Sequence, residues 1–474
     1  MRPGPRSSFK PMRLLASPAD SSTLLPLFNL AYMSFLRMPT RTRDGKYLNQ
    51  TERQRYRLRF DTRHLSWAAA FLSICPLLHA QDALRTSLAG NAAAEARMRQ
   101  LDSQAYTIKE GDFRLLVVPS LGLDWNDNVN LAKGGGEQDF ILKPFLNLHS
   151  SYPITRQNVL QFHIGVGYDK YFDHDEFSGP RVISGSETSF DIFVKDWVFD
   201  LHDRFSFTKD SAGISSLAGT GQFGGFENTA GVSGTWDLQD VVLTFGYDHQ
   251  NFISSEPVFD YVNHSAELVV ARGGFRLNPK LTVGVEGTGS FTTYDEKRLN
   301  DSRGYSGGVY ANWQPGRYFR VQPRAGYTFY DFRQTSLLIN AVDQSSWYAD
   351  LAVTHNFNEA ISYTLSAGHD LRLGIQADSV ESSHFRASID WKIIKDLSLN
   401  TYFSYEHGTQ GAGNAKGSVQ ESFDWFGGGI GLNYPLMKKL AVGLNYRLTL
   451  RSSDAADRGY AQNLVGLLFT YKFQ

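Results

Sequence analysis

The chain has 474 residues, of which 42% are hydrophobic, 20% charged and 14% aromatic, and it contains 43 glycines and one cysteine. This composition excludes a disordered chain, which has few aromatic residues and many charges, and a disulfide scaffold, which needs several cysteines. No stretch approaches ~18 uninterrupted apolar residues, which argues against a bundle of transmembrane helices. A large β protein remains, and the length allows either two or three ordinary domains or one large barrel.

Charge is distributed unevenly along the chain. Residues 1–80 hold 13 Lys and Arg against 4 Asp and Glu, whereas the remaining residues hold 34 against 44. A nucleic-acid-binding protein would carry its basic residues on the folded domain. The acidic body therefore predicts that nucleic acid is not a partner.

A secretory signal peptide is predicted at residues 61–80. A cluster of arginines from Arg53 to Arg63 precedes an apolar run from Leu65 to Ala80, and a polar segment follows at Gln81. A basic region, a short apolar core and a small residue at the cleavage point are typical of export signals. The alternative is a buried apolar helix. Cleavage after Ala80 would remove Cys75 and leave a mature chain without cysteine.

The segments on either side of the signal carry weaker patterns. Residues 1–60 are interpreted as an N-terminal extension or as the product of a mis-assigned start codon. Residues 81–111 are polar and rich in alanine, and they predict a periplasmic leader. Within this leader, residues 83–101 have the pattern of a short amphipathic helix or of a disordered segment.

From residue 112 to the C-terminus, apolar and polar residues alternate with a period of two. Between Leu440 and Leu450, for example, every second residue is apolar and the residues between them are small or polar. The alternating segments are about 10–15 residues long, against ~5–6 in ordinary sheets. Long strands with one apolar and one polar face predict an all-β fold, namely a transmembrane antiparallel up-and-down β-barrel over residues 112–474. A soluble sandwich would have shorter strands.

Turn signals predict the number of strands. Eight short turns recur at intervals of about 40 residues, which is one hairpin per repeat. With one strand before them (Phe113–Trp125) and one after them (Tyr460–Phe473), they predict about 18 strands, or 16–20 if a strand is faint or kinked. Longer polar segments, including residues 126–139, 173–185, 209–225, 334–345 and 408–421, lie between the short turns. The short turns are expected near Ile154, Asp196, Gln239, Pro279, Pro315, Asn358, Lys395 and Met437.

Tryptophans beyond the signal lie near the predicted strand ends. An indole ring favours the headgroup level of a membrane, so two such groups predict two aromatic girdles that contact outer-membrane lipid. The alternative is chance clustering. The expected girdle residues are Trp197, Trp236, Trp313 and Trp391 near the short turns, and Trp125, Trp347 and Trp425 near the long loops.

The last strand carries a targeting pattern. Val465, Leu467, Phe469, Tyr471 and Phe473 share one face, and Gln474 ends the chain. The segment resembles the terminal strand by which outer-membrane proteins engage the barrel-assembly machinery, although that strand usually ends in an aromatic residue.

The segment from Tyr106 to residue 146 resembles the opening of outer-membrane porins of the "putative β-barrel porin 2" type, and it is similar to barrels encoded with exopolysaccharide or exosortase systems. Those proteins begin with a strand, an Asp- and Asn-rich first loop, and a returning strand that contains Asp-Phe-Ile and a proline. The resemblance implies an outer-membrane barrel, names no catalytic residue and leaves the transported solute undefined. The matching residues are Asp124, Asn126, Asp127, Asn128, Asp139, Phe140, Ile141 and Pro144.

Motifs for cofactors, metals and catalysis are weak. The oxygen side chains from Asp124 to Asn130 alternate as in a calcium loop, but Val129 stands where glycine is required and no glutamate closes the loop. The histidines are not spaced as metal ligands. No cofactor or metal is therefore predicted, and an enzyme is not expected, although a catalytic site made of residues distant in sequence is left open.

Charged residues on the polar faces of the predicted strands are expected to line the lumen. Such residues tune the passage of solutes through an open pore, whereas in a plugged lumen the same charges would be paired. The preferred interpretation is a passive diffusion pore for small solutes or a channel associated with exopolysaccharide. The alternatives are a structural or adhesive barrel and, less favoured, an outer-membrane enzyme. The candidate lumen residues are Asp169, Glu286, Arg320, Arg324, Arg447 and Arg451, with further charges at Asp191, Asp200, Asp370 and Arg372.

Overall fold

The alternating segments form a closed ring of antiparallel strands in the computed structural model, which describes residues 106–473 apart from 156, 222, 395 and 412–419. The predicted extension, signal peptide and leader helix lie outside the described residues. All described residues belong to one unit, residues 61–474. No helix among them is long and apolar enough to cross a membrane.

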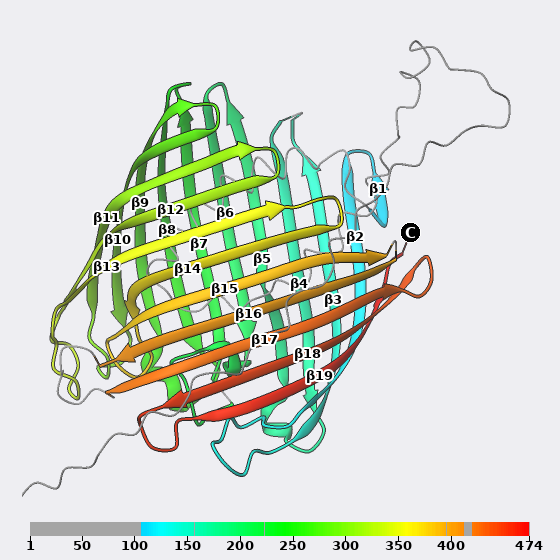
Figure 1. Ribbon diagram of the computed structural model, residues 1–474, viewed down its shortest axis with the longest axis vertical. Helices are drawn as coiled ribbons and strands as arrows, with labels where there is room; N and C mark the ends of the chain where they lie inside the picture. Colours follow the sequence, from blue (N-terminus) through cyan, green and yellow to red (C-terminus); the bar gives the residue numbers. More distant parts are fainter. Residues whose placement is uncertain (1–105, 156, 222, 395, 412–419, 474) are drawn as a thin grey trace, which may run out of the picture. The chain divides into compact units, whose positions relative to one another are not determined.

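Eighteen strands close the ring, and this confirms the predicted fold class and strand number. Each strand from β2 to β18 pairs with the next one, and β19 pairs back with β2. Figure 1 shows β13–β19, in yellow to red, crossing in front of the strands of the opposite wall. The strands of the ring are β2 (Phe113–Asn126), β3 (Asp139–Pro153), β4 (Val159–Tyr171), β5 (Gly179–Val194), β6 (Trp197–Thr208), β7 (Gly225–Asp237), β8 (Val241–Ser254), β9 (His264–Asn278), β10 (Leu281–Tyr294), β11 (Ser302–Gly316), β12 (Phe319–Phe332), β13 (Gln344–Asn356), β14 (Ile361–Leu373), β15 (Ser379–Ile394), β16 (Leu397–Gln410), β17 (Glu421–Pro435), β18 (Leu440–Ser453) and β19 (Tyr460–Tyr471).

Short elements accompany the ring. Strand β1 (Ile108–Glu110) lies within the segment expected as a leader, and it pairs with β2 through a turn at Gly111, where φ is +59°. Within the described parts of the long loops lie the short 3-10 helices η4 (Asp175–Phe177), η5 (Ser211–Gly213) and η6 (Pro257–Val262).

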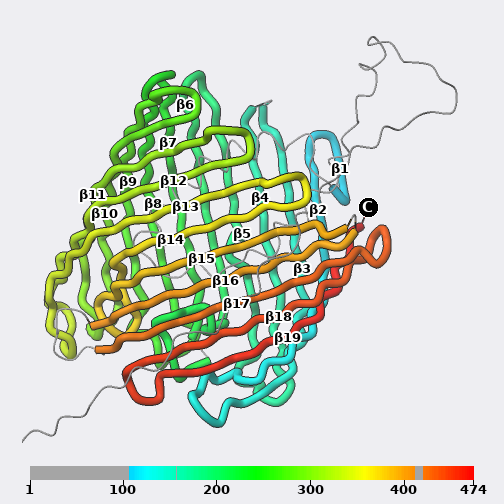
Figure 2. The backbone as a smooth tube through the Cα atoms, viewed as in Figure 1, coloured from blue at the N-terminus to red at the C-terminus, as the bar shows by residue number. Residues whose placement is uncertain are grey.

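The turns follow the predicted pattern. All eight expected short turns lie within two residues of a gap between consecutive strands, and the long loops alternate with them. Figure 2 shows the short turns of the yellow-to-red strands gathered at one end of the barrel and their longer loops at the other. The gaps that contain the short turns are residues 154–158, 195–196, 238–240, 279–280, 317–318, 357–360, 395–396 and 436–439.

One expected loop boundary is wrong. Residues 173–185 were expected to form a loop, but β5 already begins at Gly179. The register of β5 with β6 shifts between Val182 and Ser186, and Gly185 has a φ of +93°. This bulge interrupts the alternation of apolar and polar residues, so the sequence pattern does not predict β structure for the first residues of the strand.

The inner wall uses glycines to bring together side chains from strands that are not neighbours. Gly231 of β7 lies in register between His202 of β6 and Asp248 of β8. His202 Nδ1 lies 2.5 Å from Asp200 Oδ1, and its Nε2 lies 2.7 Å from Asp248 Oδ1. A side chain at Gly231 would fill the space through which His202 reaches Asp248.

Gly231→Ala is expected to lower the free energy of unfolding by about 1–3 kcal/mol, because the buried contact between His202 and Asp248 must open or the backbone must shift. An ideal Cβ at this position would lie 2.1 Å from Asp248 Oδ1 and 2.7 Å from Tyr247 O. Gly307→Ala is the matched control, since a Cβ there meets nothing within 4 Å. Urea unfolding from lipid vesicles measures the stability of both variants. Equal losses of unfolding free energy would contradict the close approach of His202 and Asp248 at Gly231.

Candidate functional site

One long loop crosses the interior of the barrel. Residues 209–224, here called L3, connect β6 to β7, and the side chains that bind Ser215 of this loop lie on β14, β16 and β18. In the ring of eighteen strands, β16 lies nearly opposite β6 and β7. Because the partner side chains share the inner face of their strands, L3 reaches them through the lumen.

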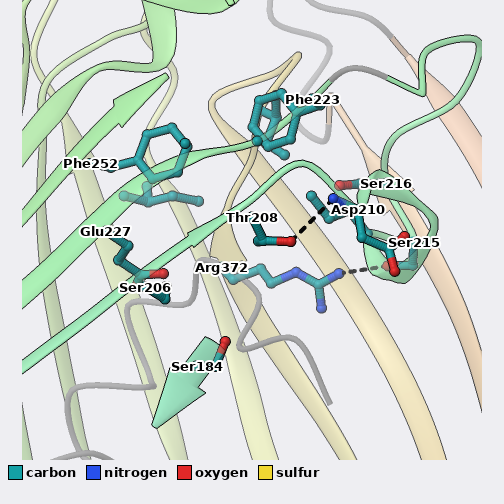
Figure 3. Close-up of a pocket in the computed structure, with 15 residues that line it drawn as sticks. Ser184, Ser206, Thr208, Asp210, Ser215, Ser216, Phe223, Glu227, Phe252 and Arg372 are labelled. Atoms are coloured by element: carbon teal, nitrogen blue, oxygen red, sulfur yellow. Dashed lines mark hydrogen bonds between the residues drawn. The ribbon is translucent and has the colours of Figure 1, made fainter. Parts of the chain in front are cut away.

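Ser215 joins L3 to the opposite wall. Its Oγ donates a hydrogen bond to Glu406 Oε1 at 2.7 Å and accepts one from Arg372 at 3.2 Å. Arg451 Nε donates to the backbone carbonyl of Ser215 at 2.8 Å. Figure 3 shows Arg372 pointing toward Ser215 from the other side of the cavity. The tip of L3 is therefore held by three strands at once.

Two buried arginine–carboxylate clusters lie beneath these contacts. Arg372 forms ion pairs with Glu406 and, at 3.7 Å, with Asp370. Glu421 lies 2.7 Å from Arg451 and 2.8 Å from Arg458, whose guanidinium also donates to the carbonyl of Ser216. The side chains of Glu421 and Arg451 are 0% exposed.

A more accessible ion pair lies at the start of L3. Asp210 Oδ2 accepts a hydrogen bond from Arg447 at 2.8 Å, and its side chain is 51% exposed. Burial raises the pKa of the Asp210 carboxyl, but attraction to Arg447 and the hydrogen bond outweigh burial and lower the pKa to about 2. The stability that this pair contributes is thus present above the usual carboxyl pKa and is lost as the pH falls through about 2.

The long loops pack against one another over L3. A cluster of buried apolar side chains joins L3 to the loops that follow β8, β10, β12 and β14. A second cluster joins it to the first loop and to β19. A Cβ at Gly221 would lie 1.9 Å from the carbonyl oxygen of Val129 in the first loop. The first cluster consists of Ile214, Leu217, Phe223, Phe252, Phe259, Tyr261, Val262, Leu299, Ile339 and Ile375.

A cavity of about 50 Å³ lies beside L3. Hydroxyl groups from β5, β6 and L3 line it together with Glu227 and Arg372, while Phe223 and Phe252 form an apolar side (Figure 3). The hydroxyl-bearing residues are Ser184, Ser206, Thr208, Ser215 and Ser216.

A second charged network covers the inner wall between β9 and β13. Glu286 lies 3.7 Å from Arg272 and 3.9 Å from Arg324, which in turn lies 2.6 Å from Asp350. Tyr348 donates a hydrogen bond to Glu286 at 3.0 Å across Gly308 and Gly326. Fixed charges of both signs thus alternate around this side of the wall.

The expected lumen residues all lie on the inner face by strand register. Asp169 pairs with Arg181 at 3.2 Å, and Glu286, Arg324, Arg447 and Arg451 belong to the networks described above. Arg320 shares the inner face of β12 with Arg324 but lies exposed near the short-turn end. Paired charges are the feature expected of a plugged lumen rather than of an open pore, and L3 crosses the same lumen.

Asp210, Ser215, Glu406 and Glu421 were not singled out from the sequence. Their partners are distant in the chain, so local periodicity carries no trace of the pairing. One signal was available, because L3 contains Ile214, Leu217 and other apolar residues that a loop exposed to solvent does not need.

The expected girdle tryptophans divide into two groups. Six lie on the outer face, and among them Trp197 and Trp236 stack with ring centroids 5.0 Å apart. Trp425 lies on the inner face, since its register partner is Arg451 and it shares the face of Glu421. Its place in the girdle is therefore corrected. The six outer residues are Trp125, Trp197, Trp236, Trp313, Trp347 and Trp391.

Metal ligands do not gather in the described part of the chain. Within residues 106–473, as far as the structure describes them, no group of three or more His, Cys, Asp or Glu side chains is arranged to hold a metal ion.

Several solved structures resemble this chain over most of their length. OccK2 (OpdF) of Pseudomonas aeruginosa, solved in complex with glucuronate, is 9% identical with a TM-score of 0.44, and the match covers 77% of this chain and 99% of that chain. OccAB3 of Acinetobacter baumannii is 7% identical (TM-score 0.43, 76% and 99% covered). A BenF-like porin of Pseudomonas fluorescens is 8% identical (TM-score 0.43, 76% and 99% covered).

Family membership rests on a stronger match. Comparison with curated proteins gave no match. The family model described as "Putative beta-barrel porin 2" matches residues 103–473, which include every strand of the ring. The chain therefore belongs to the putative beta-barrel porin 2 family of outer-membrane barrels.

Proposed function

We propose that this outer-membrane barrel is a passive diffusion channel for small polar solutes, with L3 forming its narrowest part. The observation that carries the proposal is the crossing of L3 through the lumen to Arg372, Glu406 and Arg451. A barrel of 16–18 strands encloses an aqueous channel, and a loop anchored across it limits the size of the solute.

The orientation and processing of the chain belong to the same proposal. After export and cleavage following Ala80, the short turns and both termini would lie in the periplasm and the long loops outside the cell. The outward-facing tryptophans would contact lipid at the headgroup level, and β19, which closes the ring with β2, would engage the assembly machinery.

A channel for exopolysaccharide is the second form of this function. A polymer must thread an extended chain past L3, whereas a small solute needs only a path beside it. The contacts of L3 with the opposite wall therefore favour small solutes. A structural or adhesive barrel would use the outer loops alone, and it gives no role to the hydroxyl-lined cavity.

An enzyme is the alternative with one specific observation behind it. On the outer face, His369 Nδ1 lies 2.9 Å from Ser383 Oγ and its Nε2 lies 3.1 Å from Glu381 Oε1. Ser383 is paired in register with His369 on one side and with His407 on the other. The backbone of Ser383 is therefore paired with both neighbouring strands. Its N–H group is not available to stabilise an oxyanion beside the serine.

Liposome swelling separates these functions. Vesicles that contain the purified chain are expected to swell in glucose and not in maltohexaose, because L3 excludes the longer molecule. Protein-free vesicles are the control. Swelling in both sugars would favour a polymer channel, and an absence of swelling with well-folded protein would favour a structural barrel.

A further inference from the structure

Three guanidinium groups of the β14–β18 wall meet L3, and they differ in what else they bind. Arg451 is paired with Glu421, and Arg372 is paired with Glu406 and Asp370, so wall carboxylates neutralise both. From L3, the Oγ and the carbonyl oxygen of Ser215 accept hydrogen bonds from these two groups.

Arg447 is different, because the carboxylate that pairs with it belongs to the loop. Asp210 of L3 makes the ion pair, and the hydrogen bond to the wall is to the amide oxygen of Gln462 at 3.3 Å. Arg447 Nε has no hydrogen-bond partner within the part of the chain that the structure describes. The nearby wall acid Asp124 is engaged with Lys143 at 2.6 Å.

The geometry of the Asp210 pair leaves room for a better ligand. One guanidinium nitrogen of Arg447 lies 2.8 Å from Asp210 Oδ2, but the other lies 3.5 Å from Oδ1. A guanidinium binds a carboxylate most strongly through two parallel hydrogen bonds, and a free carboxylate can take that position where a tethered one cannot.

Solvent reaches this pair, unlike the other two. The side chain of Arg447 is 27% exposed, compared with 5% for Arg372 and 0% for Arg451. Ser215, Ser216 and the apolar cluster hold the rest of L3 through contacts that do not involve Asp210.

We propose that Arg447 is a binding site for the carboxylate group of a passing solute, and that Asp210 occupies it as a tethered competitor when no solute is bound. The proposal rests on the proposed channel function and names small carboxylates as a substrate class. Lys143, which is paired with Asp124, also attracts the charge of Asp210. A solute anion would displace Asp210 from Arg447 and pass the narrowest part of the channel. Asp210 would then pair with Arg447 again.

Calorimetry on the purified full-length protein in detergent tests the site without requiring conduction. Gluconate and sorbitol are the probes, because they share the same chain of hydroxyl groups and differ in the carboxylate. Asp210→Asn is expected to bind gluconate about tenfold more tightly than the natural chain, since the competitor no longer holds the site. The amide keeps an oxygen that accepts from the Ala212 N–H, so η5 retains its cap.

The other variants serve as controls. Arg447→Gln should abolish saturable gluconate binding, and Arg303→Gln, which removes an exposed guanidinium from the outer face of β11, should leave it within about twofold of the natural chain. Sorbitol binding should not change in any variant. Heat-modified migration on gels confirms that each variant is folded.

Three results would overturn the site: equal gluconate affinity in Asp210→Asn and the natural chain, binding that persists in Arg447→Gln, or a parallel change for sorbitol. The channel itself is judged separately from the currents of the same proteins in planar bilayers. Saturable gluconate binding in a protein that carries no current would support the site and contradict the channel.

Discussion

Glu421→Ala is expected to lower the free energy of unfolding by about 3–5 kcal/mol, the cost of leaving buried charge without a partner. Glu421 lies within 2.8 Å of both Arg451 and Arg458, and its side chain is 0% exposed. Removing the carboxylate leaves two guanidinium groups beside L3 without the acid that pairs with them among the described residues. The result should include a loss of order in L3 as well as in the loop after β18.

Urea unfolding from lipid vesicles measures the change, and limited proteolysis reports the release of L3. Glu296→Ala in an exposed part of the β10–β11 loop is the control, and it should change the stability by less than about 0.5 kcal/mol. A loss below about 1 kcal/mol for Glu421→Ala would mean that the cluster is not buried as described.

Leu444→Arg should destabilise the barrel by about 2–4 kcal/mol if it lies near the midplane of the membrane. Leu444 is 51% exposed on the outer face of β18, and its register partners are Leu432 and Leu467. A charged side chain there would replace an apolar one in contact with lipid hydrocarbon.

Asn445→Arg tests the opposite face one residue further along. Asn445 lies in register between Gly431 and Gly466 on the inner wall, where water can solvate a charge. Its effect should be far smaller than that of Leu444→Arg when both are refolded into vesicles and unfolded with urea. Equal defects would contradict the register of β18.

The strands and short turns were predictable because the pattern that specifies them is local. In β18, each apolar residue from Leu440 to Leu450 alternates with a small or polar one, and this period of two decides which face meets lipid. The pattern fails where that period is broken. The bulge at residues 183–185 of β5 hid the start of the strand.

Trp425 was misplaced for a related reason. It is adjacent to Phe426, and a run of three glycines follows, so the sequence does not show which aromatic ring faces outward. The register with Arg451 decides it, and register is a property of the neighbouring strand.

The candidate site itself could not be predicted in the same way. Inner-face charges such as Arg447 and Arg451 follow from alternation, but their partners do not. Asp210 is separated from Arg447 by 237 positions, and Ser215 is separated from Glu406 by 191. Such pairs depend on closure of the ring, which brings β6 opposite β16. The pattern of a short segment does not predict a contact between residues so far apart in the chain.

Single-channel conductance in planar bilayers tests the central claim, that L3 narrows a conducting barrel. The natural chain should give small, reproducible current steps. A variant in which residues 211–221 are replaced by a short Gly-Ser linker should give steps several times larger, because the anchors at Ser215 and Ser216 are removed while the ring is left intact. Steps of the same size in both proteins, or no current from correctly folded natural protein, would contradict the account.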